Sequence, residues 1–257
     1  MQPSGVPAGA PRVADVSIAT ALGARVRASG ANPLVTHVGS DGRTELSATS
    51  VANAAAKIAN ALLDECDCAP GDVIVVALPP HWQRTCWLAG AWLAGVAVAV
   101  VDDPTKAAAT AADVGAVLVV VGSPDAAQIA SAPCPVAAVS LHPLGLPQPV
   151  PDGAVDASAL VRVQPDAFLG VPADGSAPAF VDATGAVHSQ DDLLAMAAQR
   201  AADWGLVEGG RLRVDPSLRG DDAWLAVLAV PLAARAAVVI AVEADGVTER
   251  VTASVPG

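Results

Sequence analysis

The sequence predicts an α/β protein built of two similar layers, each with a largely parallel sheet. Of its 257 residues, 53% are hydrophobic and 16% are charged, which is enough apolar material for a sizeable core. Short aliphatic runs alternate with helical patterns between residues 70 and 140, as is typical of parallel strands covered on both faces. The same order of elements returns beyond residue 178, which indicates a diverged duplication.

The first elements are a helix, a hairpin and a second helix. Apolar residues at helical spacing predict the first helix over 14–29. Strand-like runs over 33–38 and 43–46 flank Asp41-Gly42, a pair typical of a tight turn. An apolar stripe then predicts a helix over 47–63. The stripe consists of Val51, Ala55, Ile58 and Leu62, with Asn53, Lys57 and Asn60 off it and with Ser47, Thr49 or Ser50 as the cap.

Strands and helices alternate in the next part of the chain. The expected elements are a strand over 73–78, a helix over 81–94, a strand over 96–101, a short helix over 106–113, a strand over 116–121, a helix opening at Ser123-Pro124 and a strand over 136–140. The segment 142–166 is proline-rich and has no periodicity, so we expect a linker or a long surface loop there.

The last part predicts a second hairpin over 179–188 with its turn at Thr184-Gly185. The elements expected after it are a helix over 189–205 with a capping box of Ser189 and Asp192, a strand over 211–214, a helix over 221–234 and a strand over 236–242. The chain therefore divides into a first αβ subdomain (12–141), a linker (142–166) and a second αβ subdomain (167–257).

The second subdomain is expected to be a partial repeat of 34–102. The corresponding pairs are Gly42 with Gly185, Ser47 with Ser189, Pro70-Gly71-Asp72 with Glu208-Gly209-Gly210, Trp87-Leu88-Ala89 with Trp224-Leu225-Ala226, and Val98-Ala99-Val100 with Val238-Val239-Ile240. The offset between partners drifts by a few positions, so small gaps are needed.

Charge and composition exclude two classes of partner. The formal charge is −12, the pI is about 4.5 and tyrosine is absent. Nucleic acids and anionic membranes require a basic surface, so neither is expected to bind. The longest apolar run, 85–101, predicts a core helix followed by a core strand, because Gly95 divides it and Asp102-Asp103 ends it. Residues 1–11 have no secretory pattern, which favours a cytoplasmic protein.

The four cysteines favour a reduced state over a disulfide framework or a zinc site. They are Cys66, Cys68, Cys86 and Cys134, and none is paired by a motif with His37, His81, His142 or His188.

The stretch 44–104 resembles the opening of the adenylate-forming superfamily, which includes acyl-CoA synthetases, luciferases and peptide-synthetase adenylation domains. The resemblance rests on the hairpin, the helix 51–63, the run 70–79 (Pro-Gly-Asp-Val-Ile-Val-Val-Ala-Leu-Pro), the run 87–95 and the strand 98–104. It extends more weakly over the whole chain and is strongest to a group of short actinobacterial proteins related to these enzymes. It implies the αβ scaffold of the N-terminal region of these enzymes.

The resemblance also implies catalytic parts that these 257 residues do not match. A phosphate loop ending in Pro-Lys-Gly is expected just before the helix at Ser189, yet the chain has Thr184-Gly185 there and no lysine after Lys106. The later threonine–glutamate segment, the ribose-binding aspartate and the mobile domain with its lysine have no counterpart. We therefore assign no catalytic, cofactor-binding or metal-binding residue.

Several polar residues are expected to have structural rather than catalytic roles. Asp102-Asp103 follow a strand, where ligands often bind, but a solvated strand end is the favoured interpretation. Asp191-Asp192 and Asp221-Asp222 begin helices and suit capping. His188 lies near Asp182 and Thr184 and is expected to be a polar strand residue. The tryptophans fall on core-facing positions.

Three functional hypotheses remain. The first is a non-catalytic binding or interaction module that uses a groove between the two αβ halves. The second is a subunit of an acyl-adenylating or acyl-CoA ligase assembly, which retains ligand binding and needs a partner for catalysis. The third is a homodimer, or a complex with a related short protein.

Overall fold

The computed structural model describes residues 16–39, 42–146, 148–215, 217–241 and 252–255. Within them lie a seven-stranded sheet of order β7-β6-β5-β3-β4-β8-β9 and a five-stranded sheet of order β12-β10-β11-β1-β2. Only the β1–β2 and β8–β9 pairs are antiparallel. The prediction of an α/β fold with two largely parallel sheets is therefore confirmed.

The strands are β1 (Pro33–Gly39), β2 (Gly42–Ser47), β3 (Val73–Ala77), β4 (Ala97–Val100), β5 (Leu118–Val121), β6 (Val136–Ala138), β7 (Val155–Asp156), β8 (Pro178–Val181), β9 (Val187–Ser189), β10 (Arg211–Val214), β11 (Ala237–Ala241) and β12 (Ala253–Ser254). The helices are α1 (Ile18–Ser29), α2 (Ala48–Asp64), α3 (Trp82–Leu93), the 3-10 turn η1 (Pro104–Lys106), α4 (Ala107–Val114), α5 (Ala126–Ser131), α6 (Ala157–Val163), α7 (Gln190–Asp203), α8 (Asp221–Leu225) and α9 (Ala229–Ala233).

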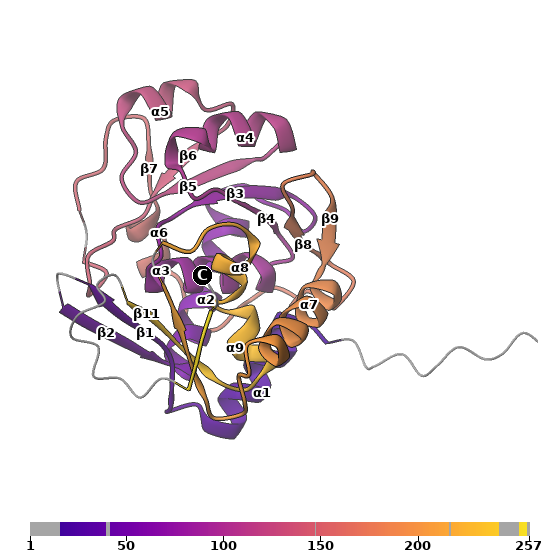
Figure 1. The fold of residues 1–257 in the computed structure, drawn as a ribbon. Coiled ribbons are helices and arrows are strands. Elements are labelled where there is room, and N and C mark those ends of the chain that lie inside the picture. The colour runs from indigo at the N-terminus through magenta and orange to yellow at the C-terminus, as the bar shows by residue number, and fades with distance from the viewer. Residues whose placement is uncertain (1–15, 40–41, 147, 216, 242–251, 256–257) are drawn as a thin grey trace, which may run out of the picture.

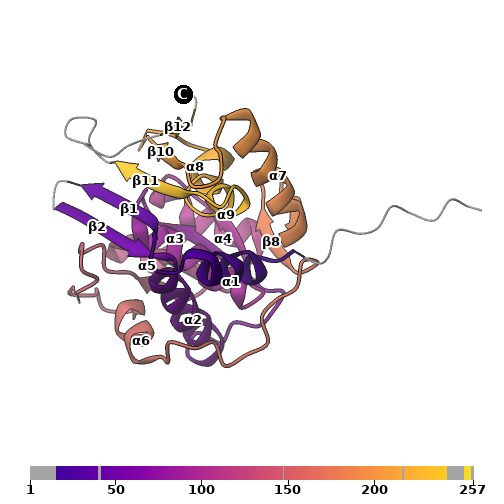
Figure 2. The ribbon, with the colours of Figure 1, turned by 90° about the horizontal axis from the view of Figure 1, so that it is seen from below.

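Helices separate the two sheets and also cover the outer face of the larger one. In Figure 1, α4 and α5 lie above the seven-stranded sheet, and α2, α3, α8 and α9 lie below it, toward the five-stranded sheet. Figure 2, seen from below, shows α1 and α2 in front of these layers. The main apolar core fills the space between the sheets, and a smaller core packs α4 against β3, β4 and β5.

In each sheet, a hairpin from one part of the chain pairs with strands from a distant part. The β1–β2 hairpin pairs with β11, where Val35 lies opposite Val238, and the β8–β9 hairpin pairs with β4, where Val98 lies opposite Phe180. The orders β3-β4-β8-β9 and β10-β11-β1-β2 are thus built in the same way. The duplication and the subdomain bounds stay predictions, but the strand pairing crosses those bounds in both sheets.

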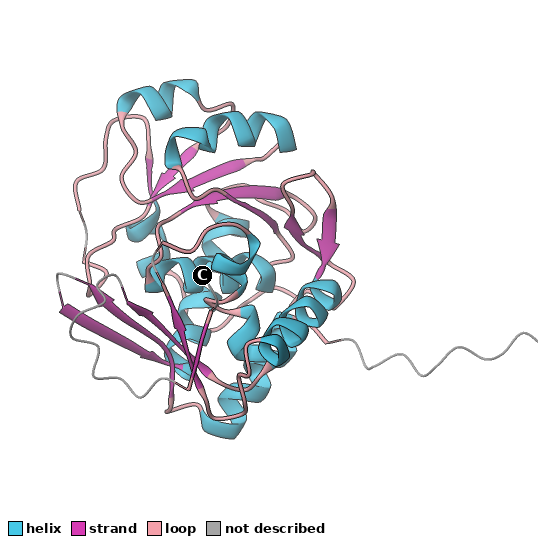
Figure 3. Ribbon diagram, viewed as in Figure 1, coloured by secondary structure: helices cyan, strands magenta, loops and turns pink. Residues whose placement is uncertain are grey.

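Three predicted segments differ in the structure (Figure 3). The helix expected to open at Ser123-Pro124 begins instead at Ala126, after its cap Asp125. The segment 142–166 is not wholly a loop, because β7 pairs with β6 and α6 follows it. The helix expected over 221–234 is broken into α8 and α9. Pro231 has no N–H to donate to the Val227 carbonyl four residues earlier, and the Thr85 hydroxyl donates to that carbonyl instead, at 3.1 Å.

The capping box of Ser189 was predicted correctly, and for α2 the cap is Ser47, one of the three candidates. Ser47 caps α2 and Ser189 caps α7, the latter with Asp192 in a capping box. Asn60 lies off the apolar stripe and was therefore expected on the polar side of the helix, but it is only 2% exposed. Its side chain bonds to the loop after α6, a distant contact that helical periodicity does not reveal.

Candidate functional site

A cavity of about 990 Å³ opens at the carboxyl ends of β4 and β8. Its walls are the β4–α4 connection, the turn after β8 and the residues just before and within α8, and Phe180 and Trp224 line its interior. The carboxyl ends of strands are where open α/β sheets bind ligands. Both aromatic side chains are only 2% exposed, and their ring centroids are 4.0 Å apart.

The turn between β8 and β9 is organised by the carboxylate of Asp182. Its Oδ1 accepts hydrogen bonds from the Thr184 N–H (2.8 Å), the Thr184 hydroxyl (2.7 Å) and the Ala186 N–H (3.0 Å). The N–H groups that could bind an anion in this turn therefore already bind an internal carboxylate. Gly185, at φ 84°, provides the left-handed residue that the turn requires.

His188 holds the other oxygen of the same carboxylate. Its Nε2 lies 2.9 Å from Asp182 Oδ2, and its ring stacks on Phe180 with centroids 5.7 Å apart. The bond to His188, followed by the bond to Thr184, holds the pKa of Asp182 well below its ordinary value. Asp182 is therefore a fixed negative charge at the cavity wall.

Asp221 faces the same space from the start of α8. Burial raises the pKa of Asp221, and the neighbouring charges of Asp182 and Asp222 raise it further, while a hydrogen bond to Trp224 opposes the shift. Of the described residues that line the cavity, five are aspartates and two are cations. They are Asp102, Asp103, Asp113, Asp182 and Asp221, against Lys106 and Arg219.

The expectation that Asp102 is only a solvated strand end was wrong, because its carboxylate makes two contacts within the protein. Its Oδ2 accepts the Gly220 N–H at 2.9 Å, and its Oδ1 lies 3.4 Å from Nη2 of Arg84, which is 1% exposed. Arg84 also donates from Nε to the Leu78 carbonyl at 2.7 Å. Together these bonds fix the wall of the cavity near α8. Arg84 is the single charged residue of the buried helix α3, and this was the sequence signal for the contact with Asp102.

The remaining candidates have structural roles. Asp103 caps η1, and Asp192 completes the capping box of Ser189 on α7. The capping expected of Asp191 and of Asp221-Asp222 is not observed: Asp191 accepts the Val16 N–H, Asp222 binds Arg200 at 2.7 Å, and the N-cap of α8 is Gly220, without a side-chain cap. All four cysteines are free thiols, and burial raises the pKa of Cys86 to about 12. Across the part of the chain that the structure describes, no three histidine, cysteine or carboxylate side chains gather as metal ligands.

The tryptophan prediction is confirmed for three side chains. Trp87, Trp92 and Trp224 are at most 2% exposed, whereas Trp82 and Trp204 are half-buried. The Trp92 indole N–H donates to the Ala179 carbonyl at 2.7 Å, which joins α3 to β8 beneath the cavity.

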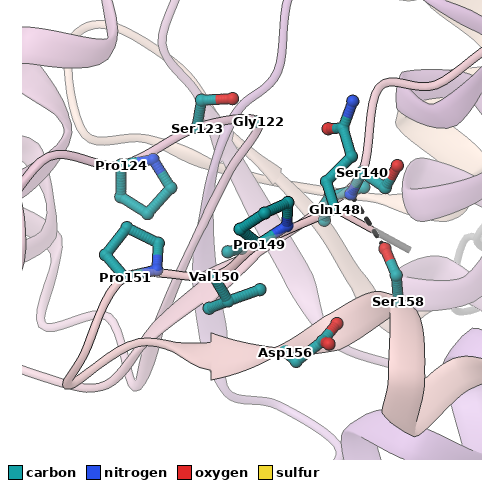
Figure 4. Close-up of a pocket in the computed structure, with 12 residues that line it drawn as sticks. Gly122, Ser123, Pro124, Ser140, Gln148, Pro149, Val150, Pro151, Asp156 and Ser158 are labelled. Atoms are coloured by element: carbon teal, nitrogen blue, oxygen red, sulfur yellow. Dashed lines mark hydrogen bonds between the residues drawn. The ribbon is translucent and has the colours of Figure 1, made fainter.

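A second cavity, of about 90 Å³, lies at the carboxyl ends of β5 and β6 (Figure 4). Pro124, Pro149 and Pro151 line it, and the Ser158 hydroxyl accepts the Ser140 N–H at 2.8 Å. Ligand pockets usually measure about 300–1,000 Å³, so this hollow is too small for an organic ligand.

No helix among the described residues combines the length and apolar character needed to cross a bilayer. The apolar run 85–101 forms the buried α3 and β4, as predicted.

Comparison with known proteins identifies relatives of this chain. A TIGR03089 family protein of Mycobacterium tuberculosis (strain ATCC 25618 / H37Rv) is 34% identical over 199 residues, which are 77% of this chain and 76% of that protein. No family model matches the chain.

Solved structures show the same fold. A Brucella canis acyl-CoA synthetase superposes with a TM-score of 0.71 at 18% identity, covering 91% of this chain and 44% of that one. The N-terminal domain of FACL13 from Mycobacterium tuberculosis gives 0.66 at 17% identity, covering 87% of this chain and 56% of that one. The chain has the fold of the N-terminal domain of adenylate-forming enzymes and spans less than half of the length of the full synthetase.

Proposed function

The chain belongs to the TIGR03089 family, and we propose that it is a non-catalytic binding module with an adenylate-forming fold. One observation carries the proposal, namely that the carboxylate of Asp182 occupies the turn between β8 and β9. The family resemblance places the phosphate loop in this turn. An anion-binding loop needs free N–H groups and a positive field, and here the N–H groups of Thr184 and Ala186 are satisfied by a negative charge.

The charge around the turn supports the same proposal. Asp182 keeps its charge because its pKa is lowered, and Asp102, Asp103 and Asp221 line the same cavity. A nucleotide triphosphate in this cavity would be repelled by these carboxylates, and the described lining provides two cations against them. The buried aromatic pair Phe180 and Trp224 instead suits an uncharged or cationic ligand with an apolar part.

A second candidate is a ligand-binding subunit that needs a partner for catalysis. The position of Lys106 in the cavity wall favours it, because a lysine is the side chain that adenylate-forming chemistry would require near a phosphate. The two candidates differ in one measurable property, which is the affinity for an adenylate.

The test is thermal unfolding of the full chain with ATP–Mg, AMP, coenzyme A and a non-hydrolysable acyl-adenylate analogue. We expect no shift of Tm at millimolar ligand, because a ligand that does not bind the folded state does not stabilise it. A full-length acyl-CoA synthetase, measured in parallel, is the positive control. A concentration-dependent rise of Tm with an adenylate would reject the non-catalytic module and favour the second candidate.

A matched pair of variants locates any binding that is found. Lys106→Gln removes the cation in the cavity wall, and Lys57→Gln removes the other lysine of the chain, which lies on α2 and bonds to the loop after α6. If the ligand binds in this cavity, Lys106→Gln should weaken binding and Lys57→Gln should not. Equal loss in both variants would place the ligand elsewhere.

A further inference from the structure

The segment 140–146, which we call the 140–146 loop, follows β6 of the larger sheet and reaches across to the smaller one. The Thr44 hydroxyl of β2 donates to the Pro143 carbonyl at 2.9 Å. From α3, the Gln83 side chain donates to the Ser140 carbonyl at 3.3 Å. The loop therefore joins the two sheets through single side-chain hydrogen bonds, and segments held in this way open before the rest of a protein unfolds.

The loop packs on Trp82, the first residue of α3. A Cβ added to Gly145 would lie 3.4 Å from the Trp82 ring. The indole is half-buried, and its Nε1 is buried without a hydrogen-bond partner among the described residues. Leu144 and Leu146 of the loop are 76% and 50% exposed. A loop that moved away from α3 would therefore add Trp82 to an apolar surface that these two leucines already present.

The start of α3 depends on a neutral histidine. His81 is 5% exposed, and its Nδ1 accepts the Gln83 N–H at 3.2 Å as the N-cap of the helix. A protonated Nδ1 can only donate, so protonation of His81 abolishes this cap. The Leu141 carbonyl of the loop lies against the same ring. One imidazole thus links the start of the helix to the loop.

A second histidine disfavours a charge at this place. The His37 ring of β1 is 7% exposed, and its centroid lies 4.3 Å from that of the His81 ring. Its Nε2 is buried without a hydrogen-bond partner in the described part of the chain. Beside His37 the neighbouring strands place Thr44 and Ile240, and neither is charged. Two imidazolium ions so close together would repel each other, so the pair is stable only when it is neutral.

The charged groups nearby do not offset this repulsion. Arg84 of α3 binds Asp102 rather than a histidine. Arg43 and Glu45 of β2 are paired with each other, and they lie on the opposite face of the strand from Thr44 because side chains alternate along it. Within the described residues, no carboxylate acts on either histidine ring.

His142 is the remaining titratable group of the loop. Its Nδ1 accepts the Leu144 N–H at 3.1 Å, and its carbonyl accepts the Gly145 N–H at 2.8 Å. These bonds shape a turn inside the loop and do not join it to α3. His142 is therefore a matched comparison for His81.

We propose that the 140–146 loop is an acid-sensitive latch, in which protonation of His81 releases the loop from α3 and exposes the apolar surface around Trp82. Desolvation, followed by the neighbouring His37, lowers the pKa of His81 to about 3, although the Leu141 carbonyl opposes the shift. Opening of the loop returns the ring to water and its pKa to about 6.5. The closed loop is therefore stable above pH 6.5, and its stability is lost as pH falls toward 3.

The test is hydrogen–deuterium exchange of the full chain at pH 7.5 and 5.5, corrected for the intrinsic exchange rate at each pH. One proton that binds only the open loop raises the opening constant about tenfold between these pH values. We expect the protection of residues 140–146 and of the first turn of α3 to fall by about tenfold or more. The amides of β3 and β4, which exchange through global unfolding, should stay unlabelled over the same time. Unchanged protection of the loop, or labelling of β3 and β4 together with it, would overturn the proposal.

Three substitutions locate the switch. His81→Asn keeps an N-cap acceptor without a titrating ring and should lose most of the pH response. His142→Asn keeps an acceptor for the Leu144 N–H and should retain a response of about tenfold. Thr44→Val removes the bond to Pro143 and should speed exchange of the loop at both pH values without changing their ratio. A response that is lost in His142→Asn but kept in His81→Asn would place the switch elsewhere and reject the role of His81.

Discussion

The Thr85 hydroxyl of α3 donates to the Val227 carbonyl at 3.1 Å, at the break between α8 and α9. Thr85 is 0% exposed and Val227 is buried as well. A side chain from the first half of the chain thus donates the hydrogen bond that the Val227 carbonyl lacks, because Pro231 has no N–H with which to donate it.

Thr85→Val should reduce the free energy of unfolding by about 1–3 kcal/mol, because it leaves a buried carbonyl without a donor at nearly constant volume. Urea unfolding followed by tryptophan fluorescence measures the change. Thr110→Val in α4 is the matched control, since none of the described side-chain hydrogen bonds involves it, and it should change stability by less than about 0.5 kcal/mol. Equal effects in the two variants would contradict this role for Thr85.

Arg235 has a left-handed backbone, with φ 52°, two residues before β11, and Gly95, with φ 76°, lies two residues before β4. The carbonyls of both residues accept an N–H from the preceding glycine turn, Gly71 to Gly95 at 2.8 Å and Gly209 to Arg235 at 3.1 Å. Arg235→Gly should leave stability unchanged or raise it by up to about 1 kcal/mol, because a non-glycine residue is disfavoured in this region.

Gly95→Ala is the converse change and should be destabilising by about 1–2 kcal/mol. Its Cβ would also lie 3.3 Å from the Cβ of Pro70. Thermal and urea unfolding of both variants provide the comparison. A stabilised Gly95→Ala protein would show that the two turns are not equivalent.

The neutral pair His37 and His81 predicts a loss of stability in mild acid. The rings are buried with centroids 4.3 Å apart, and desolvation, followed by the neighbouring His37, lowers the pKa of His81 to about 3. Desolvation also lowers the pKa of His37. Because the unfolded chain binds these protons near pH 6.5 and the folded chain does not, the stabilisation is present above pH 6.5 and is lost as pH falls toward 3.

Between pH 6.5 and 5 the free energy of unfolding should fall by about 1–2 kcal/mol from His81 alone. His81→Asn retains an N-cap acceptor for the Gln83 N–H, at 3.2 Å in the wild type, and removes the titrating ring. Its stability should therefore vary less over this range, as measured by urea unfolding at each pH. A slope equal to that of the wild type would contradict the assignment.

Asn60→Ala should release the segment 165–169 without unfolding α2. Three hydrogen bonds are lost, and the variant should be about 1–3 kcal/mol less stable and more rapidly cleaved by proteases within that segment. Asn53→Ala, on the same helix, is the control and should keep the wild-type cleavage rate. Unchanged cleavage in Asn60→Ala would mean that other contacts hold the segment.

Local patterns were sufficient to predict most elements and several caps. The alternation of aliphatic strands with helices predicted the parallel strands, and Ser47 and Ser189 marked the starts of α2 and α7. What was missed depends on contacts far apart in the chain. Asn60 and Arg84 look like solvent-facing residues within their own helices, and only packing against 165–169 and Asp102 explains their burial.

No residue of the candidate site was assigned from the sequence. Asp102 was interpreted as a solvated strand end and Asp221 as a capping residue, whereas Asp182 and Thr184 were noted only as neighbours of His188 in a hairpin turn. They line one cavity because β8 is placed beside β4, a pairing between strands some 80 residues apart that periodicity does not reveal. The lowered pKa of Asp182 likewise depends on four hydrogen bonds that only the folded hairpin makes.

The exchange of hairpins between the two sheets has a consequence for synthesis on the ribosome. β1 begins at Pro33, but the strand that covers its free edge, β11, begins at Ala237 and is made much later. Until then the nascent chain carries an uncovered strand edge and cannot complete its smaller sheet, and this high contact order is expected to slow folding. The exposure of this strand edge during translation is therefore set by the topology, independently of how stable the finished protein is.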